Sequence, residues 1–378
     1  MGVEAVNCVP VSSCDQMAQR KSRDIFAPAI IGVAVACLSM PIAACARSNA
    51  SQPTTARAVS DWVAGAKPGD RILLAAGDYG SLKLKHRVFL SPGVLIQAAP
   101  GAKVTFSSIV IDGSQGLTIK GVDVNVAASN FGVTVSHSSR ITLAGLKIHA
   151  PRDASPSPNA IMLRYARDVI VEDCQIQDVA FGISFADSDH LKILRNDIAD
   201  LKVDAIRGSA SYVDVIGNHA ENFRPEQGDH PDFIQFWGAG VAVPNKELTI
   251  RDNVYERGSG VGVQGIFLED IDGVVISGNA LLGTMYNAVS LARVHGALIE
   301  NNFVQSYPDM GARIVARGES ADVIVRNNIA PAILSYAENG KPNPGYLEEH
   351  NQTIGVAKQG DTSGLRAWLA KRPAPQPD

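Results

Sequence analysis

The sequence predicts an all-β fold, a right-handed parallel β-helix of about ten coils behind a short N-terminal capping helix. Three observations predict this fold. Stretches of alternating apolar residues recur along residues 57–336, an asparagine follows many of them at a fixed distance, and a second apolar strand pattern occurs once per repeat.

The first observation is an alternation of period two, which indicates a strand with one buried face. From residue 116 onward such stretches begin at Leu117, Ile141, Val169, Leu191, Val213, Leu248, Val274, Ala297 and Val323.

The second observation is an asparagine three residues after the last apolar position in six successive repeats. The intervals between these asparagines are 22, 35, 26, 23 and 26 residues, the size of one β-helix coil. Asparagine tolerates left-handed backbone angles at a turn. Stacked at about 4.8 Å, each side-chain amide can also bond the next. We therefore expect a ladder formed by Asn196, Asn218, Asn253, Asn279, Asn302 and Asn328.

The third observation is a second strand in each coil, with one inward apolar position per strand. Repeated βαβ units need more residues between strands, and propeller blades need about 40 or more residues per repeat. A parallel β-helix remains. The inward positions are Val133, Ile161, Ile183, Ile206, Ile234, Ile266, Val289 and Ile314.

Composition agrees with this fold and excludes some partners. Apolar residues make up 46% of the 378 residues, which excludes global disorder. Aromatic residues make up only 6% while glycine reaches 34 residues, as is typical of short strands and tight turns. Lys+Arg is 34 against Asp+Glu 38, so no basic excess points to nucleic acid as a partner.

The N-terminal 45 residues have the pattern of an export signal. Basic residues at positions 20–23 precede an apolar run over 27–44. This run is short and interrupted by prolines, whereas a membrane span needs about 20 apolar residues. We expect residues 1–45 to be a leader, with Met17 as an alternative start, and residues 46–56 to be a flexible tether.

The end of the leader fits two kinds of cleavage. Ile42-Ala-Ala-Cys45 resembles the bacterial lipoprotein box, in which the cysteine is lipidated, and Ala44-Cys-Ala46 fits an ordinary A-x-A site. We favour a lipid anchor at Cys45, with the protein in the periplasm or at the outer membrane, and keep secretion as the alternative. Cys174 is the one cysteine of the body, so no internal disulfide forms there, and we expect it in the core.

The two ends of the solenoid have their own patterns. Residues 58–66 predict an amphipathic helix, followed by a Pro68-Gly69 turn, a strand at 71–75 and a turn at 77–78. A helix there would cover an open strand edge and the apolar cross-section of the stack. After Tyr336 the repeat fades, and residues 337–378 predict a polar loop, a short helix over 362–371 that covers the C-terminal end, and a tail.

The largest insertion marks the candidate site. The interval from Asn218 to Asn253 is longer than its neighbours, and residues 222–237 are rich in ionisable and aromatic side chains that lead into a strand. Such a loop is typical of a functional site.

Register selects the neighbouring side chains. Exposed positions after the inward residues hold Arg207, Gln235, Trp237 and Glu269, with Arg293 beside them. Asp204, Asp232, Gln264 and Asn287 stand two residues before the inward positions. We expect these four to point into the groove or to bond turn amides, because buried unpaired carboxylates are costly. Lys202, His230 and Tyr286 border the start of the same strands.

The chain resembles the pectate-lyase-like superfamily of parallel β-helix proteins. The resemblance rests on the helix, Pro-Gly-Asp, strand and Gly-x-Tyr order over residues 58–79 and on the coils, and it covers nearly all of residues 57–336. It implies a carbohydrate-active surface. We expect a monomer whose partner is an acidic polysaccharide. Lyases, glycoside hydrolases, uronate epimerases and phage-type depolymerases share this architecture, and the fold does not select among them.

Lyase chemistry at a uronate is the activity that we favour. It needs a cation to neutralise the carboxylate, a role for Arg207 or Lys202, and a base, a role for His230 or the other cation. The unperturbed pKa of histidine suits a base, and Asp229 or Asp232 could orient its ring. Gln235, Trp237, Glu269, Arg293 and Tyr286 are the expected substrate-binding residues.

Two alternatives to a lyase stay open, a glycoside hydrolase and a protein without catalytic activity. A glycoside hydrolase would use paired carboxylates, such as Asp204 and Asp232 one coil apart. The chain lacks the Asp-Asp, G-H-G and R-I-K motifs of polygalacturonases, and His230-Pro-Asp232 reverses the Asp-Pro-His order of an epimerase motif. The third alternative is a non-catalytic adhesin or envelope scaffold, which would not need the insertion.

Calcium is common in related lyases and stays an open alternative here. Asp204, Asp229, Asp232 and Glu269 could supply oxygen ligands, but the neighbouring arginine and lysine side chains compete for them. We expect no cysteine-based metal cluster, because the body contains one cysteine.

Overall fold

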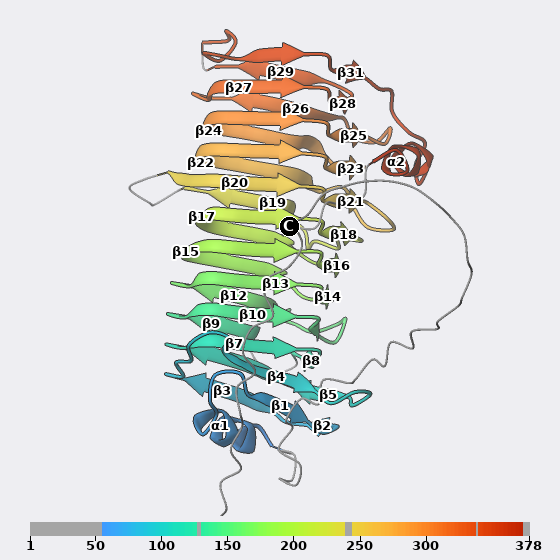
Figure 1. Cartoon of the computed structure of the whole chain (residues 1–378). Coiled ribbons are helices and arrows are strands. Elements are labelled where there is room, and N and C mark those ends of the chain that lie inside the picture. The colour runs from blue at the N-terminus through green and yellow to red at the C-terminus, as the bar shows by residue number, and fades with distance from the viewer. Residues whose placement is uncertain (1–54, 127–129, 239–243, 338, 373–378) are drawn as a thin grey trace, which may run out of the picture. The chain divides into compact units, whose positions relative to one another are not determined.

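Each coil of the chain contributes up to three parallel strands, and strands of successive coils stack into three columns (Figure 1). This computed structural model describes residues 55–126, 130–238, 244–337 and 339–372. The leader and nearly all of the tether lie outside the described residues, as does the tail 373–378. The predicted right-handed parallel β-helix is confirmed.

Two columns belong to one sheet and the third forms a sheet of its own. The first column contains β3 (Ser81–Lys85), β6 (Ser108–Asp112), β9 (Phe131–Ser136), β12 (Asn159–Arg164), β19 (Asp232–Trp237), β26 (Ala312–Arg317) and β29 (Ile333–Tyr336). The second column contains β1 (Arg71–Leu74), β4 (Val94–Ala98), β7 (Gln115–Lys120), β10 (Ser139–Ala144), β13 (Arg167–Glu172), β20 (Asn245–Arg251), β27 (Ala321–Arg326) and β30 (Leu347–Glu349).

Four long strands bend from the first column into the second: β15 (Ile183–Leu194), β17 (Ile206–Ile216), β22 (Gln264–Ser277) and β24 (Tyr286–Glu300). The third column contains β2 (Gly77–Asp78), β5 (Val104–Phe106), β8 (Asp123–Asn125), β11 (Lys147–His149), β14 (Gln175–Gln177), β16 (Asp197–Ala199), β18 (His219–Glu221), β21 (Val254–Glu256), β23 (Ala280–Leu282), β25 (Phe303–Gln305), β28 (Ile329–Ala330) and β31 (Gln352–Thr353).

Alternation produces the core as expected. In β3 the burial pattern alternates along Ser81–Lys85, with Leu82 and Leu84 inside. The eight predicted inward residues of the first column are all buried. Every second side chain along a strand therefore fills the interior of the stack, while the side chains between them face water.

The predicted asparagine ladder is present. Asn218 donates its backbone N–H and its Nδ2 to Asn253 Oδ1 at 2.9 and 3.0 Å, and the same pattern links each member to the next. Asn351 extends the ladder by one member that the sequence analysis missed.

One reason given for the ladder was wrong. The ladder asparagines are not in the left-handed region; the residue before each of them is, for example Arg195 and Asp252. The asparagines are selected because their buried side chains satisfy backbone groups of two coils.

The helix α1 (Ala56–Ala64) closes the N-terminal end, as expected. Thr55 caps it by accepting from Ala58 N, and Val59 and Val63 are buried against the core. The expected turn at residues 77–78 is instead the short strand β2, which pairs with β5.

The C-terminal part differs from expectation in two ways. Strand pairing continues past Tyr336, because β30 pairs with β27 and β31 with β28. The helix α2 (Ser363–Leu369) does not cover the end of the stack. Its Leu365 packs beside the third column, in a separate apolar cluster with Phe303 and Tyr307.

Cys174 is buried, as expected, and burial raises the pKa of its thiol to about 12. It occupies the ladder position of its coil, since its backbone N–H donates to Asn196 Oδ1. Among the described residues no helix is long and apolar enough to cross a membrane.

Candidate functional site

The insertion predicted to mark the site is divided between two places. One part is the loop 222–231 that leads into β19, and the other is residues 238–244 between β19 and β20. Residues 239–243 of the second part lie outside the described residues. The candidate site is built from the loop before β19 and the strands beside it.

Register places several predicted residues on one outward face. Arg207 of β17 pairs with Gln235 of β19, and Gln235 pairs with Phe267 of β22. Trp237 lies beside Glu269 in the same way. The predicted outward positions Arg207, Gln235, Trp237 and Glu269 are partly exposed, whereas Ser290 and Ala292, also expected to be exposed, are buried.

Asp204 and Asp232 are buried, contrary to the expectation that they point into the groove. Asp232 is the first residue of β19, so its side chain follows the alternation of that strand and faces inward. The alternative of bonding a turn amide is correct for Asp204, whose Oδ1 accepts from Asp232 N at 2.8 Å. Asp204 Oδ2 lies 3.0 Å from Arg207 Nη1.

The two carboxyl groups differ in the contacts that offset the cost of burying them. Burial and the neighbouring Asp204 charge raise the pKa of Asp232 well above its ordinary value, and Arg207 opposes this shift. Burial also raises the pKa of Asp204, but the Asp232 amide and Arg207 lower it. Within the described residues Asp232 Oδ1 is buried without a hydrogen-bond partner. Asp204 is therefore the better compensated carboxyl group of the pair, and the pKa of Asp232 is raised further above its ordinary value.

Arg207 is held on the outward face by both charge and stacking. Its guanidinium carbon lies 4.5 Å from the ring centre of Phe181 and 4.7 Å from that of Trp237, which come from the coils on either side. The Arg207 side chain is 28% exposed. One of its two Nη groups binds Asp204, so donors remain for an anionic ligand.

Phe181 was missed by the sequence analysis. A signal was present, because Phe181 stands two residues before the inward Ile183, the position that Asp204 holds in the next coil. Comparing Asp204 with the equivalent position of the preceding coil identifies Phe181.

The loop before β19 is fastened by several contacts. Lys202 Nζ lies 2.7 Å from Glu226 Oε1, and Arg224 pairs with Asp178 and Asp200. Asp229 Oδ2 accepts from Glu226 N at 3.1 Å. Lys202 is therefore already paired. The Lys202 ammonium holds the pKa of Glu226 below its ordinary value.

His230 is exposed in this loop, between Asp229 and the buried Asp232. Asp229 is near enough to Asp204 for its charge to raise the pKa of that carboxyl. The expected orientation of the His230 ring by Asp229 or Asp232 is not found among the described contacts.

Glu269 lies beside Trp237, but its carboxylate is occupied by Arg293, and the structure shows no contact of Arg293 or Tyr286 with Arg207 among the described residues. Arg293 forms ion pairs with Glu269 and with Asp270, which raise the pKa of its guanidinium. Asp270 and Arg293 both have left-handed backbones, so the bends of two adjacent coils bring them together. Tyr286 is 61% exposed and lies two coils from the loop before β19.

The carboxylates do not fit calcium. Both oxygens of Asp204 are engaged by Arg207 and the Asp232 amide, and Glu269 is paired with Arg293. In the described part of the chain no group of three or more His, Cys, Asp or Glu side chains is arranged to hold a metal.

The arrangement can bind an anion at a fixed position. A guanidinium stacked between two rings and anchored by a buried carboxylate is held in one place, and the Arg207 side chain is still partly exposed. Arginine recognises planar carboxylates through such paired donors.

A family profile described as "Right handed beta helix region" matches residues 103–304. The chain belongs to this family. A search of curated proteins finds no significant match.

Solved structures of low identity share the fold. The A-module of the mannuronan C-5 epimerase AlgE4 from Azotobacter vinelandii is 10% identical with a TM-score of 0.55, over 79% of this chain and 91% of that one. A mannuronic acid specific polysaccharide family 6 lyase from human gut microbiota is 12% identical with a TM-score of 0.51, over 84% and 91%. The tailspike protein of E. coli bacteriophage HK620 is 13% identical with a TM-score of 0.51, over 80% and 63%. These similarities show the fold.

Proposed function

We propose that this protein is an exported enzyme that cleaves an acidic polysaccharide by β-elimination at a uronate. The observation that carries the proposal is Arg207, a partly exposed guanidinium fixed by Asp204 and by the rings of Phe181 and Trp237. A carboxylate-binding group of this kind is what an enzyme that acidifies the proton beside a uronate carboxylate requires.

In the proposed reaction Arg207 binds the uronate carboxylate and stabilises the charge that develops on it. His230 takes the proton from carbon 5, the double bond forms between carbons 4 and 5, and the bond from carbon 4 to the linking oxygen breaks. The protonated imidazole then gives its proton to the leaving oxygen. Asp204 and Asp232 are positioning residues, since they are buried behind Arg207.

Structures with a TM-score above 0.5 support a polysaccharide as the substrate class. They include an epimerase named for mannuronan and a lyase named for mannuronic acid. The basic and apolar leader supports export, with Cys45 as the proposed site of a lipid anchor.

The test is incubation of the full chain with polymannuronate, polyguluronate, polygalacturonate and glucuronan. The proposal expects products that absorb near ~235 nm together with new reducing ends, because elimination leaves an unsaturated uronate. Arg207→Ala and His230→Ala should each lower the rate at least about 100-fold. Arg195→Ala is the matched control: Arg195 is also an ion-paired arginine, but it lies in the turn after the second column.

Three results would overturn the proposal. Reducing ends without absorbance would indicate a hydrolase, and the buried Asp204–Asp232 pair is the observation that favours this second candidate. Epimerised product without cleavage would indicate an epimerase. Binding without any product would indicate an adhesin.

A further inference from the structure

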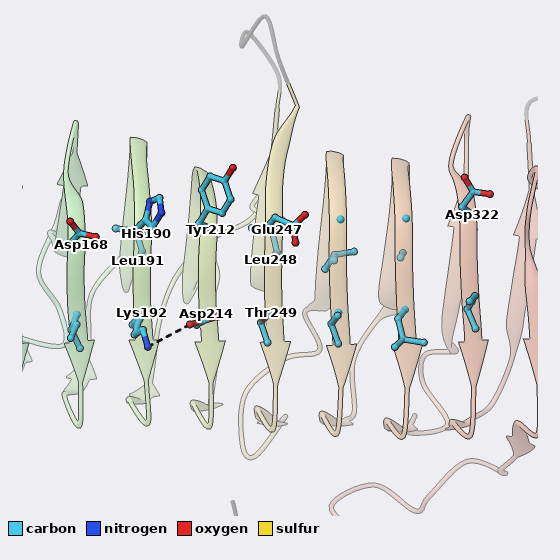
Figure 2. A pocket seen from close by; sticks show the side chains of 18 residues that line it. Asp168, His190, Leu191, Lys192, Tyr212, Asp214, Glu247, Leu248, Thr249 and Asp322 are labelled. Atoms are coloured by element: carbon cyan, nitrogen blue, oxygen red, sulfur yellow. Dashed lines mark ion pairs between the residues drawn. The ribbon is translucent and has the colours of Figure 1, made fainter. Parts of the chain in front are cut away.

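A groove lies over the outward side of the second column, away from the candidate site (Figure 2). Its volume is about 750 Å³, and its lining does not include the residues of the candidate site. Part of its floor is apolar. Val275, Leu298 and Ile324 are register neighbours on three successive coils and continue a row that includes Thr249.

One edge of this groove is lined by residues at a single repeated position, directly before the inward residue of each coil. Asp168, His190, Tyr212, Glu247 and Asp322 occupy it and stand in a row above the floor in Figure 2, with left-handed backbones. His190 and Tyr212 stack with ring centres 4.7 Å apart. Glycines at 273 and 296 leave the edge low beside the apolar floor.

The charges of the groove do not balance. Lys192 lies 3.9 Å from Asp214, Arg167 lies 3.6 Å from Asp168, and His190 lies 2.7 Å from Asp189.

Two carboxylates remain after these pairings. Glu247 and Asp322 are exposed, and the described residues provide neither side chain with an ion pair or a hydrogen bond. They stand three coils apart, about 14 Å at the spacing of adjacent strands. The groove is therefore electronegative at both ends of its apolar floor.

We propose that this groove binds a glycan with free amino groups, a polymer of glucosamine type, along the solenoid axis. The apolar faces of the sugar rings lie on Val275, Leu298 and Ile324, and ammonium groups bind Glu247 and Asp322. An acidic polysaccharide is repelled by the same two carboxylates. A second copy of the chain fits less well, because two concave faces placed together enclose a void.

The test is calorimetric titration of the full chain with a β-1,4-linked glucosamine hexamer at about pH 6, where exposed carboxylates are ionised. The fully N-acetylated hexamer and a mannuronate hexamer are the ligand controls. We expect measurable binding of the glucosamine hexamer alone. Glu247→Gln and Asp322→Asn should each weaken it about three- to fivefold, as expected for solvent-exposed ion pairs.

Asp187→Asn is the matched protein control, because Asp187 is an exposed, left-handed acidic residue outside the lining of the groove. It should leave the affinity unchanged. The inference is overturned if the glucosamine hexamer does not bind, if the acetylated hexamer binds equally well, or if the two carboxylate variants bind like the original protein. A dimer in sedimentation that Leu298→Asp dissociates would also overturn it, by assigning the floor to a second copy. The assay contains no uronate polymer and no cleavage readout, so its result is independent of the proposed function.

Discussion

Replacing Asn253 with alanine should remove one rung of the asparagine ladder and destabilise the coil that carries the candidate site. Asn253 Oδ1 accepts from Asn218 N and Nδ2 at 2.9 and 3.0 Å, and Asn253 Nδ2 donates to Val215 O and to Asn279 Oδ1. All three asparagines are 0% exposed. Water therefore has no ready access to the groups left unpaired.

The expected loss of unfolding free energy is the sum over the hydrogen bonds that Asn253→Ala removes. Leaving the buried Asn218 N–H without an acceptor costs about 1–3 kcal/mol, and each of the two lost bonds between asparagine side chains costs about 1 kcal/mol. The loss of unfolding free energy is roughly 3–5 kcal/mol. With a urea m-value near the upper end of the usual ~1–3 kcal/mol/M, the midpoint falls by about 1–2 M.

The assay is urea unfolding followed by far-ultraviolet circular dichroism. Asn339→Ala is the control, because Asn339 is exposed and its Oδ1 accepts from the nearby Lys341 N in a surface turn. Its midpoint should change by less than about 0.3 M, since surface substitutions usually stay within ~0.5 kcal/mol. An equally small change for Asn253→Ala would refute the argument that the ladder holds the coils together.

Three further predictions concern single side chains. A raised native pKa at Asp232 gives a stabilisation that is present at low pH and lost as pH rises. Asp232→Asn should therefore gain stability relative to the original protein as the pH rises above the ordinary pKa of an aspartate, and urea midpoints that stay parallel over that rise would contradict this. Trp237→Ala should weaken binding of a uronate oligomer about tenfold by releasing Arg207, whereas Trp237→Phe keeps most of it; equal losses for both variants would argue against stacking. Cys174 should resist alkylation at about pH 8 until urea is added, because only the thiolate reacts; mass spectrometry of the labelled peptides checks this, and labelling in native buffer would disprove it.

The fold could be predicted because each coil repeats the same pattern of apolar and asparagine side chains. Alternation fixes which residues face inward, and the ladder asparagines mark each turn. Asn351 escaped detection because the strand before it, Leu347–Glu349, lacks the two apolar positions of the other coils. The role of α2 could not be predicted, since an apolar helix face does not specify which side of the solenoid it covers.

The site was predicted in part for the same reason. Register correctly placed Arg207 and Trp237 on one outward face. Strict alternation also predicted that Asp204 and Asp232 face inward. We expected them to face outward because burying a carboxylate is costly, and that expectation was wrong. Arg207 and the Asp232 amide supply the compensation, and neither contact can be recognised without coordinates. The ion pairs that occupy Arg293 depend on backbone bends that sequence spacing does not reveal.

The ladder also determines how a protein of this kind can change length. Each rung offers an acceptor to the rung before it and a donor to the rung after it, so every junction between two rungs joins the same donor to the same acceptor. A duplicated module of one coil, inserted between two rungs, would meet on each side the partner it already had. Growth by whole modules leaves every junction chemically unchanged. Extra residues are also accommodated where they form a loop between strands, as in the 35-residue interval from Asn218 to Asn253, across which the ladder is intact.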